Sequence, residues 1–408
     1  MEAKQSLLRK MFSEYYRSNA DKIEPPKRLP NREFGFVLFH SQGMIRHVAF
    51  RELTELSRFM KTRTPMHAYY SSAYYRSPAE PTMERKEWLG ADLVFDIDVD
   101  HIPSPCKKQH DVWSCLSCGE AGAGMPPDKC PRCGSERIKK ETWVCETCIE
   151  IAKDEVLKLL DVLIDEFGLS KSEMYVAFSG HRGFHVHVEQ NEVLGLTQDG
   201  RREIADYLLG QGLDLYQLLD NWGVIDAGKP GWPGRIARGI YEVLEEMDEE
   251  KLSKAGLRSQ SIKLLTGKID LILEAITQTG LDKKRLSRLG PATISRLAEI
   301  AARKTRCNID EKVTIDVKRL IRLPGSLHGK TGFKVTRISC NEVEMFDPVK
   351  HAVVFNWSEH MILEVRNPPH RIVGFEFSRG SGRYKLPLPI AVYLIGNLPD
   401  KIVLLKTI

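Results

Sequence analysis

The chain has 408 residues, of which 42% are hydrophobic and 28% charged, and its formal net charge is +5 at pH 7. This composition is typical of a soluble globular protein, and the length is sufficient for about two or three structural units with buried cores. The mild positive charge suits a nucleic-acid or nucleotide partner without requiring one.

Neither end of the chain reads as a targeting or membrane segment. Residues 1–16 carry apolar side chains at helical spacing together with early charges, which predicts an amphipathic helix and not a signal peptide. The apolar stretch 389–405 is interrupted by Gly396, Asn397 and Pro399 and is too short to span a bilayer. We therefore expect a cytosolic (cytoplasmic) protein without membrane contact.

An apolar run that reads as a strand, Ala91–His101, carries an aspartate at every second position. Strand side chains alternate between faces, so Asp96, Asp98 and Asp100 are expected on one face, with neighbours about 6.5–7 Å apart along the strand. Carboxylates this close repel one another unless a cation lies between them. The spacing favours a metal site over the alternative, a solvated acidic edge.

Cysteines are concentrated in one segment. Seven of the nine lie between Cys106 and Cys148, and in a cytosolic chain they indicate metal binding and not disulfides. Cys307 and Cys340 stand apart and are expected to be small buried core residues. Eight candidate ligands fill two tetrahedral zinc sites: Cys106, His110, Cys115, Cys118, Cys130, Cys133, Cys145 and Cys148.

The eight ligands can be divided in two ways. In the nested partition, which we favour, the inner four cysteines (115, 118, 130, 133) form a zinc ribbon, and Cys106, His110, Cys145 and Cys148 form an outer site at its base. Both inner Cys-x-x-Cys turns end in glycine, which suits a knuckle turn. The alternative is sequential, with the first four ligands in one site and the last four in the other. In either case the zinc is expected to be structural.

A helix and a hairpin follow the cysteines. Apolar residues recur at three- and four-residue steps from Ile149 to Phe167, which predicts an amphipathic helix ending at Gly168. Two short strands, 175–178 and 184–188, then flank the turn "SGHRG", whose glycines and basic side chains are suited to holding phosphates. On its own this turn is equally compatible with a plain β-hairpin.

Residues 200–300 change in character. Three stretches, 201–219, 251–280 and 283–306, read as helices, and the last is basic. They indicate a helical insertion whose basic run is either a solvated face or a nucleic-acid contact. The chain then returns to strand character, and a turn-rich segment carries Arg319, Arg322, His328 and Lys330 within a dozen positions, as a triphosphate site requires. Asp310 and Asp316 are both available as a third carboxylate.

Together these segments resemble the catalytic small subunit of archaeal-type DNA primase, of the archaeo-eukaryotic primase superfamily. The resemblance is carried by "AYYSSAYYRSP" with "WLGADLVFDIDVDH", by "SGHRGFH" and by "RLIRLPGSLHGKTG", and it extends over nearly the full length. It implies a catalytic triad of Asp96, Asp98 and an aspartate in a short strand about eighteen positions before His328, which is Asp310 and not Asp316. Asp100 then becomes an accessory residue. The residues implied to bind nucleotide are Ser179, Arg182, His185, Arg322, His328 and Lys330.

The resemblance also implies the chemistry and the partners. Two Mg²⁺ or Mn²⁺ ions would support template-directed nucleotidyl transfer that makes short RNA, or also DNA, primers on single-stranded DNA, with a large subunit as partner. The chain departs from the family at His181, where arginine is common, and in its extra zinc ribbon. The rival interpretations are a metal-dependent nuclease and a non-catalytic zinc-ribbon adaptor.

The expected fold is mixed α/β (α+β), with a mostly antiparallel sheet in a primase-type catalytic core. Two insertions interrupt this core. We expect core segments at 1–103, 150–200 and 304–408, a zinc-binding insertion at 104–149 and a helical insertion at 201–303.

Overall fold

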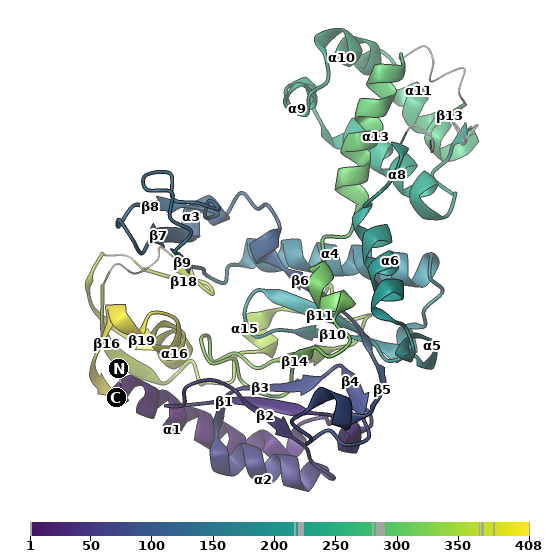
Figure 1. The fold of residues 1–408 in the computed structure, drawn as a ribbon. Helices are drawn as coiled ribbons and strands as arrows, with labels where there is room; N and C mark the ends of the chain where they lie inside the picture. Colours follow the sequence, from purple (N-terminus) through teal and green to yellow (C-terminus); the bar gives the residue numbers. More distant parts are fainter. Residues whose placement is uncertain are drawn as a thin grey trace. The chain divides into compact units, whose positions relative to one another are not determined.

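The computed structural model describes residues 2–215, 218, 224–279, 281–282, 290–366, 368, 371–377 and 380–407. The chain divides into two compact units (Figure 1). The first comprises Met1–Leu157, Ser170–Arg202 and Ile309–Ile408, and the second comprises Lys158–Leu169 and Glu203–Asn308. Every residue that the sequence singled out for catalysis, nucleotide binding or metal binding lies in the first unit.

Two four-stranded sheets form the centre of the first unit. Their strand orders are β14-β3-β1-β2 and β15-β10-β11-β6. The bounds are β1 (Phe34–Leu38), β2 (Ile45–Val48), β3 (Pro65–Ser71), β6 (Leu93–Asp98), β10 (Met174–Phe178), β11 (Gly183–Val188), β14 (Leu320–Arg322) and β15 (Thr336–Ile338). The sheets are in contact, because the hydroxyl of Tyr70 on β3 lies 2.7 Å from that of Tyr175 on β10.

Smaller sheets complete the strands of this unit. A three-stranded sheet is ordered β19-β16-β20, and another, in the cysteine-rich segment, is ordered β8-β7-β9. Their bounds, with those of the two-stranded ribbons β4-β5 and β17-β18, are β4 (Ala73–Tyr75), β5 (Trp88–Ala91), β7 (Val112–Cys115), β8 (Ala121–Ala123), β9 (Ile138–Glu141), β16 (His360–Val365), β17 (Arg371–Ile372), β18 (Phe375–Glu376), β19 (Gly382–Pro387) and β20 (Ile402–Thr407).

Helices cover the sheets of the first unit. The longest are α1 (Glu2–Asn19), α2 (Leu53–Arg63), α4 (Glu146–Asp165), which continues into the second unit, and α16 (Leu388–Asn397); shorter ones are α3 (Lys107–His110), α5 (Asn191–Leu194), α14 (Glu311–Ile315) and α15 (Pro348–His351). The 3₁₀ turns are η1 (Ala20–Lys22), η2 (Leu29–Asn31), η3 (Met83–Lys86), η4 (Val99–His101), η5 (Lys171–Glu173) and η7 (Pro399–Lys401). α1 and α2 run along β1–β3 (Figure 1), and the ring of Phe59 on α2 lies 4.4 Å from that of Phe36 on β1.

The second unit is helical. It contains most of α6 (Gln198–Leu209), then β12 (Val224–Ile225), α8 (Gly231–Glu246), α9 (Glu249–Lys254), α10 (Ser259–Thr266), α11 (Ile269–Glu274), the π-helical turn η6 (Ala275–Thr279), β13 (Leu281–Asp282) and α13 (Pro291–Thr305). Its core is built from apolar side chains of α8 and α13, including Ile236, Ile240, Leu297 and Ala301. The helix predicted at 283–306 is present from Pro291; positions 283–289 lie outside the described residues, as do 216, 217 and 219 in the helix predicted at 201–219.

The predicted mixed α+β class is confirmed. All strand pairings within the described part of the chain are antiparallel. The amphipathic helix predicted at the N-terminus is α1, and the apolar tail is split between α16 and β20. Among the described residues, no helix combines the length and the apolar character that crossing a membrane requires.

Candidate active site and metal centres

A pocket of about 520 Å³ opens in the first unit, between side chains of both central sheets. Because strand side chains alternate, β3, β6 and β11 each contribute every second residue to it. β6 contributes Asp96 and Asp98, β11 contributes Gly183 and His185, and β3 contributes His67 and Tyr69. Strand register sets these side chains against one another, since Asp96 pairs with His185 and Tyr69 with Arg322.

The acidic wall of the pocket lies on β6. Burial raises the pKa of Asp96 to about 7, and the neighbouring charges of Asp98 and Asp310 add to this effect. Burial, together with the charge of Asp100, also raises the pKa of Asp98. These carboxylates repel one another in the metal-free protein, and a bound cation would relieve the repulsion.

Asp310 lies beside Asp96, and Asp316 does not. The backbone N–H of Asp310 donates to the carbonyl oxygen of Asp96 at 2.9 Å, which joins the start of α14 to β6. The carboxylate of Asp316, at the other end of α14, accepts a hydrogen bond from the backbone N–H of Lys318. The expected short strand at Asp310 was wrong: the residue is the N-cap of α14, and its carboxylate accepts from the N–H of Lys312 at 3.0 Å.

The prediction that Asp100 continues the strand was also wrong. β6 ends at Asp98, and the chain turns into η4 because the Asp98 carboxylate accepts a hydrogen bond from the backbone N–H of Asp100 at 2.9 Å. A carboxylate that caps a nearby N–H offers the backbone an alternative to the strand ladder. Asp100 therefore leaves the alternating row, although it still contributes to the pocket lining.

The opposite wall of the pocket is basic. It is formed by Arg319, Arg322 and Lys330, with His328 beside them. The guanidinium of Arg322 lies over the ring of Tyr69, 5.2 Å from its centroid, and its Nη1 is 2.9 Å from Nδ1 of His67.

The turn between β10 and β11 lies next to this wall. Ser179, His181 and His185 line the pocket. His181 stacks on His328 with ring centroids 5.4 Å apart, and Nε2 of His185 is 3.4 Å from the Asp96 carboxylate. Of the six residues predicted to bind nucleotide, five therefore line one pocket.

Burial keeps the histidines of the pocket neutral. Loss of hydration, together with nearby arginine charges, lowers the pKa of His67, His181 and His185 to about 3 in each case. The pKa of His328 is lowered well below its ordinary value for the same reasons. These rings can donate or accept a hydrogen bond near pH 7, but they contribute no positive charge, so the cationic character of the pocket depends on arginine and lysine.

Arg182 is the sixth predicted nucleotide ligand, and it lies apart from the pocket lining. Its side chain is only 1% exposed and forms ion pairs with Asp100 and Asp111. Its backbone is nevertheless part of the hairpin turn, since the Arg182 carbonyl accepts from the N–H of Val99.

Two pocket residues were not anticipated. His67 directly precedes the tyrosine-rich segment and Tyr69 lies within it; both belong to β3, and the sequence assigned neither of them a role in the site. His67 is a contact partner of both Arg322 and the Gly329 N–H, at 2.9 and 3.3 Å. The one available signal was their i, i+2 spacing in an otherwise apolar strand, which indicates a shared face but not what that face meets.

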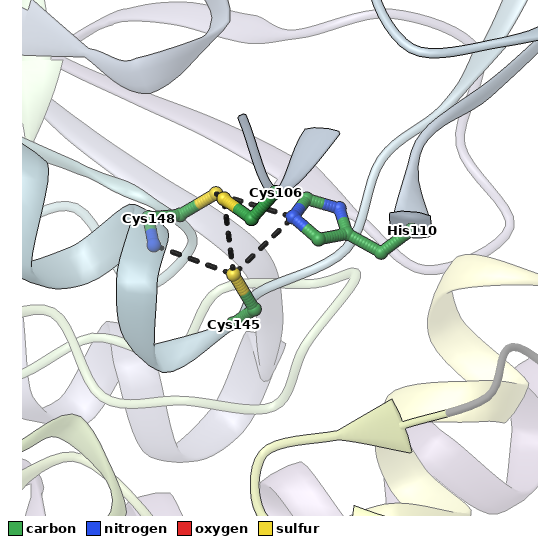
Figure 2. A group of neighbouring side chains, drawn as sticks. All are labelled: Cys106, His110, Cys145 and Cys148. Carbon is green, nitrogen blue, oxygen red and sulfur yellow. Dashed lines mark hydrogen bonds between the residues drawn. The ribbon is translucent and has the colours of Figure 1, made fainter. Parts of the chain in front are cut away.

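The structure gathers the eight candidate zinc ligands into two groups of four. Within each group, one ligand atom from every residue lies within 4.8 Å of the others. The outer group joins Cys106, His110, Cys145 and Cys148, and the inner group joins the cysteines at 115, 118, 130 and 133 (Figure 2 shows the outer one). This grouping is the nested one. Among the described residues no third group is as tight, so the three aspartates stand wider apart than the cysteines do.

The outer group has the donor chemistry of a Cys₃His zinc site. His110 Nε2 lies 3.2 Å from the Cys145 sulfur and 3.4 Å from the Cys148 sulfur. Its Nδ1 lies 2.7 Å from the carboxylate of Asp111, which fixes the ring with Nε2 toward the thiols. Hydrogen bonding by Cys148 and His110 lowers the pKa of Cys145 to about 4, so this sulfur is a thiolate, the form that binds metal.

The inner group belongs to a small ribbon. Cys115 ends β7, and its sulfur lies 3.6 Å from that of Cys133; the sulfurs of Cys118 and Cys130 are also 3.6 Å apart. Each group of four could therefore hold one metal ion. The remaining two cysteines, Cys307 and Cys340, are buried, as predicted.

Comparison with known proteins agrees with this geometry. A family model described as DNA primase small subunit matches residues 127–339. The chain is 35% identical to the DNA primase small subunit PriS of Methanothrix thermoacetophila, over 97% of this chain and 98% of that protein. It is 36% identical to the same subunit of Methanococcoides burtonii, over 95% and 96%, and of Archaeoglobus fulgidus, also over 95% and 96%. The chain therefore belongs to the DNA primase small subunit family.

Proposed function

We propose that this primase small subunit makes short RNA primers on single-stranded DNA by template-directed nucleotidyl transfer in the pocket between the two central sheets. Extension with deoxyribonucleotides is part of the same proposal. The observation that carries it is the pairing of an acidic wall, Asp96 and Asp98, with a basic wall, Arg319, Arg322 and Lys330, across one pocket. A nucleoside triphosphate with divalent ions presents the complementary charges.

The catalytic ions would be Mg²⁺ or Mn²⁺, held by Asp96, Asp98 and Asp310. The oxygen-only donor set suits these hard cations. Support for the fit comes from the raised pKa of Asp96: burial is its main cause, and the like charges of Asp98 and Asp310, which a cation would neutralise, add to it. When bound, such ions lower the pKa of the attacking hydroxyl and neutralise the triphosphate and its leaving group.

The protein's own side chains would hold and orient the nucleotide. Arg322 and Lys330 provide fixed positive charge for phosphate oxygens, where charge develops during transfer. His185 and His328 are neutral and would act as hydrogen-bond donors. Ser179, in the turn between β10 and β11, lines the same pocket and offers its hydroxyl. No side chain needs to act as a general base when the hydroxyl is activated by an ion.

The same proposal includes two structural zinc ions and a protein partner. The outer Cys₃His group and the inner Cys₄ group would each hold one Zn²⁺. Each ion would be structural, because four tightly grouped protein ligands leave no open position for catalysis.

The relatives are named small subunits, which supports a complex with a primase large subunit. Single-stranded DNA would be held through its phosphates, without reading sequence.

The test is incubation with a single-stranded DNA oligonucleotide, labelled nucleoside triphosphates and Mn²⁺, followed by separation of the products by length. New labelled chains support a primase. Shortened DNA without new chains would identify a nuclease, and binding of DNA without either product would identify a zinc-ribbon adaptor. The Asp96→Asn and Asp98→Asn variants are the controls, because each should bind DNA and give no new chains.

A further inference from the structure

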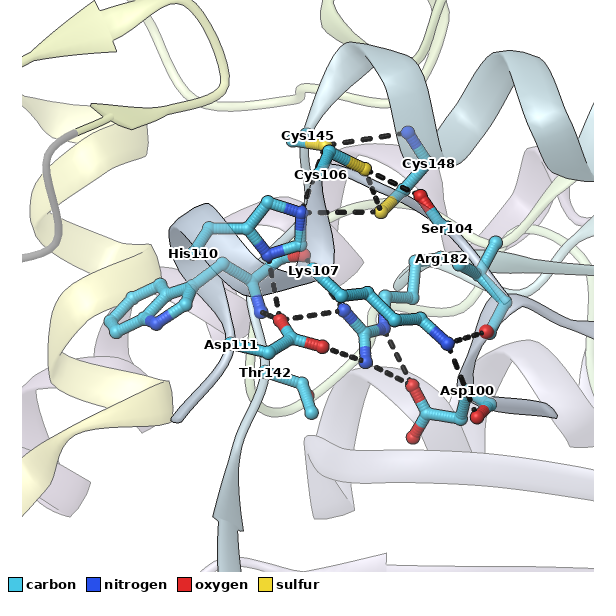
Figure 3. Close-up of polar contacts among 12 residues, drawn as sticks. Asp100, Ser104, Cys106, Lys107, His110, Asp111, Thr142, Cys145, Cys148 and Arg182 are labelled. Carbon is cyan, nitrogen blue, oxygen red and sulfur yellow. Dashed lines mark hydrogen bonds and ion pairs between the residues drawn. The ribbon is translucent and has the colours of Figure 1, made fainter. Parts of the chain in front are cut away.

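Arg182 is a buried cation held between two carboxylates from different segments. Nε donates to Asp100 at 2.7 Å, Nη1 donates to Asp111 at 2.9 Å, and Nη2 lies 2.8 Å from the other oxygen of Asp111 (Figure 3). Nη2 also contacts Asp100, and Nη1 donates to the carbonyl of Trp143 at 3.2 Å. The five N–H groups of the guanidinium are therefore all directed at protein acceptors, which leaves none for a nucleotide phosphate.

One of these carboxylates, that of Asp111, lies beside the outer metal group. Asp111 follows His110 directly, and its Oδ1 contacts both Nδ1 of His110 and Nη1 of Arg182. The same oxygen accepts a hydrogen bond from the backbone N–H of Trp143 at 3.3 Å. Such a carboxylate orients the histidine toward its metal, and here it also fixes the guanidinium.

The other carboxylate, that of Asp100, lies in η4, the turn that directly follows β6. The backbone N–H of Asp100 donates to Oδ1 of Asp98, so the position of Asp100 orients the Asp98 carboxylate. Lys107 supplies a second link from the metal-binding segment, because its buried ammonium donates to the carbonyls of Val99 and Ile102. The turn after the acidic strand is thus held at two points by residues linked to the outer metal group: by Arg182, which Asp111 anchors, and by Lys107, which follows Cys106 (Figure 3).

We infer that Arg182 is a positioning residue. Asp111, beside the outer Cys₃His group, anchors Arg182; Arg182 fixes Asp100, and Asp100 in turn orients the carboxylate of Asp98. The metal-binding insertion therefore sets the affinity of Asp96 and Asp98 for divalent ions. The inference rests on the proposed function, since it requires Asp98 to be a ligand of the catalytic ions. It assigns Arg182 to the aspartates and not to the triphosphate.

The test is the dissociation constant for Mn²⁺, measured from the electron paramagnetic resonance of free Mn²⁺, in the full-length Asp111→Asn protein. The substitution keeps the shape of the side chain and an oxygen for His110, but it removes the charge that anchors Arg182. Loss of a partner behind a metal ligand weakens metal binding by about 10- to 100-fold, and we expect about 10-fold here. Zinc content, measured by elemental analysis, should stay at the parental value.

Asp92→Asn is the matched control. Asp92 is the sole carboxylate that pairs with buried Arg32 in the described structure, at 2.6 Å, and it directly precedes β6, at the end of the strand opposite to Asp98. Both substitutions neutralise the carboxylate partner of a buried arginine, so both should lower the melting temperature. Only Asp111→Asn should weaken Mn²⁺ binding. Parental Mn²⁺ affinity in a folded, zinc-containing Asp111→Asn protein would overturn the inference.

A second variant decides the question if Asp111→Asn loses zinc or does not fold. Arg182→Lys keeps the charge, but one ammonium cannot bridge both carboxylates in this geometry. Mn²⁺ binding should therefore again weaken by about 10-fold. Arg32→Lys is the control for this variant. Parental affinity in Arg182→Lys would overturn the inference. If Asp98→Asn leaves the Mn²⁺ affinity of the parent unchanged, the proposed function fails, and this inference fails with it.

Discussion

Asp96 combines burial with a close like-charged neighbour, and this makes its ionisation costly. Its pKa in the folded, metal-free protein is about 7, against 3.8 for an ordinary aspartate. Because the folded pKa is the higher one, the folded state binds more protons than the unfolded state between about pH 4 and pH 7. Stability is therefore lost as the pH rises through this window, and the loss is complete above about pH 7.

We predict that Asp96→Asn stabilises the metal-free protein at about pH 8 by up to about 4 kcal/mol, and leaves its stability nearly unchanged at about pH 4. The amide resembles the protonated carboxyl, so the two proteins differ only where Asp96 is ionised. Urea unfolding in buffer without Mg²⁺ or Mn²⁺ measures the difference. An equal difference at both pH values would contradict the assigned pKa.

The two candidate third carboxylates make different contacts and should behave differently. We predict that Asp310→Ala abolishes nucleotide incorporation, while Asp316→Ala retains most of it. Asp310 is joined to Asp96 through its backbone N–H and adds to the rise in the pKa of that residue; the carboxylate of Asp316 accepts a local hydrogen bond from Lys318. Incorporation of labelled nucleotide on single-stranded DNA measures both. The assignment of Asp310 is wrong if the Asp316 variant is the inactive one.

Arg322 and His328 line the pocket that we propose holds the nucleotide. We predict that Arg322→Ala raises the apparent KM for nucleotide by about tenfold or more, because a hydrogen bond to a charged group contributes about 1.5–3 kcal/mol. His328→Ala should raise it less, since its neutral ring adds no charge. Some loss of kcat is expected where the contacts tighten in the transition state.

Arg337 provides a matched control for Arg322. Each guanidinium lies over a tyrosine ring, Arg322 over Tyr69 and Arg337 over Tyr175, but of the two only Arg322 lines the pocket. Arg337→Ala should leave the KM at the parental value. Equal KM values for the Arg322 and Arg337 variants would remove Arg322 from the triphosphate site.

At the scale of elements, the zinc ribbon is a loop on the hairpin formed by β7 and β9. Val112 pairs with Glu141 at the base of this hairpin, where Asp111 and Trp143 are also hydrogen-bonded. Deleting Trp113 to Glu136 would leave residues 137–140 as a short connection across that base. A four-residue connection is an ordinary length for a hairpin loop.

We therefore predict that this deletion removes one of two zinc ions and leaves the outer group intact. The free energy of zinc binding is folding free energy for short loops without a core, so the ribbon should fold only with its own ion. Elemental analysis of the purified deletion variant should find one zinc per chain, against two in the parent. A folded variant without zinc would exclude the nested arrangement.

At the scale of the whole molecule, we propose a primase-type core that two insertions interrupt. We propose that the second unit, residues 158–169 and 203–308, is the helical insertion expected at 201–303, and that the cysteine-rich segment is the zinc-binding one. The core returns after residue 308 to supply β14 and the basic wall. A chain organised in this way brings residues more than 200 positions apart into one pocket, as with Asp96 and Arg322.

Much of the site could be predicted from the sequence because its signals are local. The alternation that places Asp96 and Asp98 on one face, the Cys-x-x-Cys turns and the hairpin at Ser179 each depend on neighbours a few residues apart, and backbone geometry relates such neighbours directly. The antiparallel character of the core followed from the hairpin and from the resemblance of the motifs. These features require no knowledge of which strands lie side by side.

Only the tertiary structure decided which side chains from distant segments come into contact. The register between β3 and β14 brings His67 to Arg322, and packing of α14 on β6 joins Asp310 and not Asp316 to Asp96. The pairing of β11 with β6 brings Arg182 to Asp100, and its guanidinium pairs with Asp100 and Asp111, because a buried guanidinium takes nearby carboxylates that can satisfy its donors. Residue types and spacing determined that this chain carries acids, cations and candidate metal ligands; the distances between distant segments determined which of them line the pocket and which pair with other side chains instead.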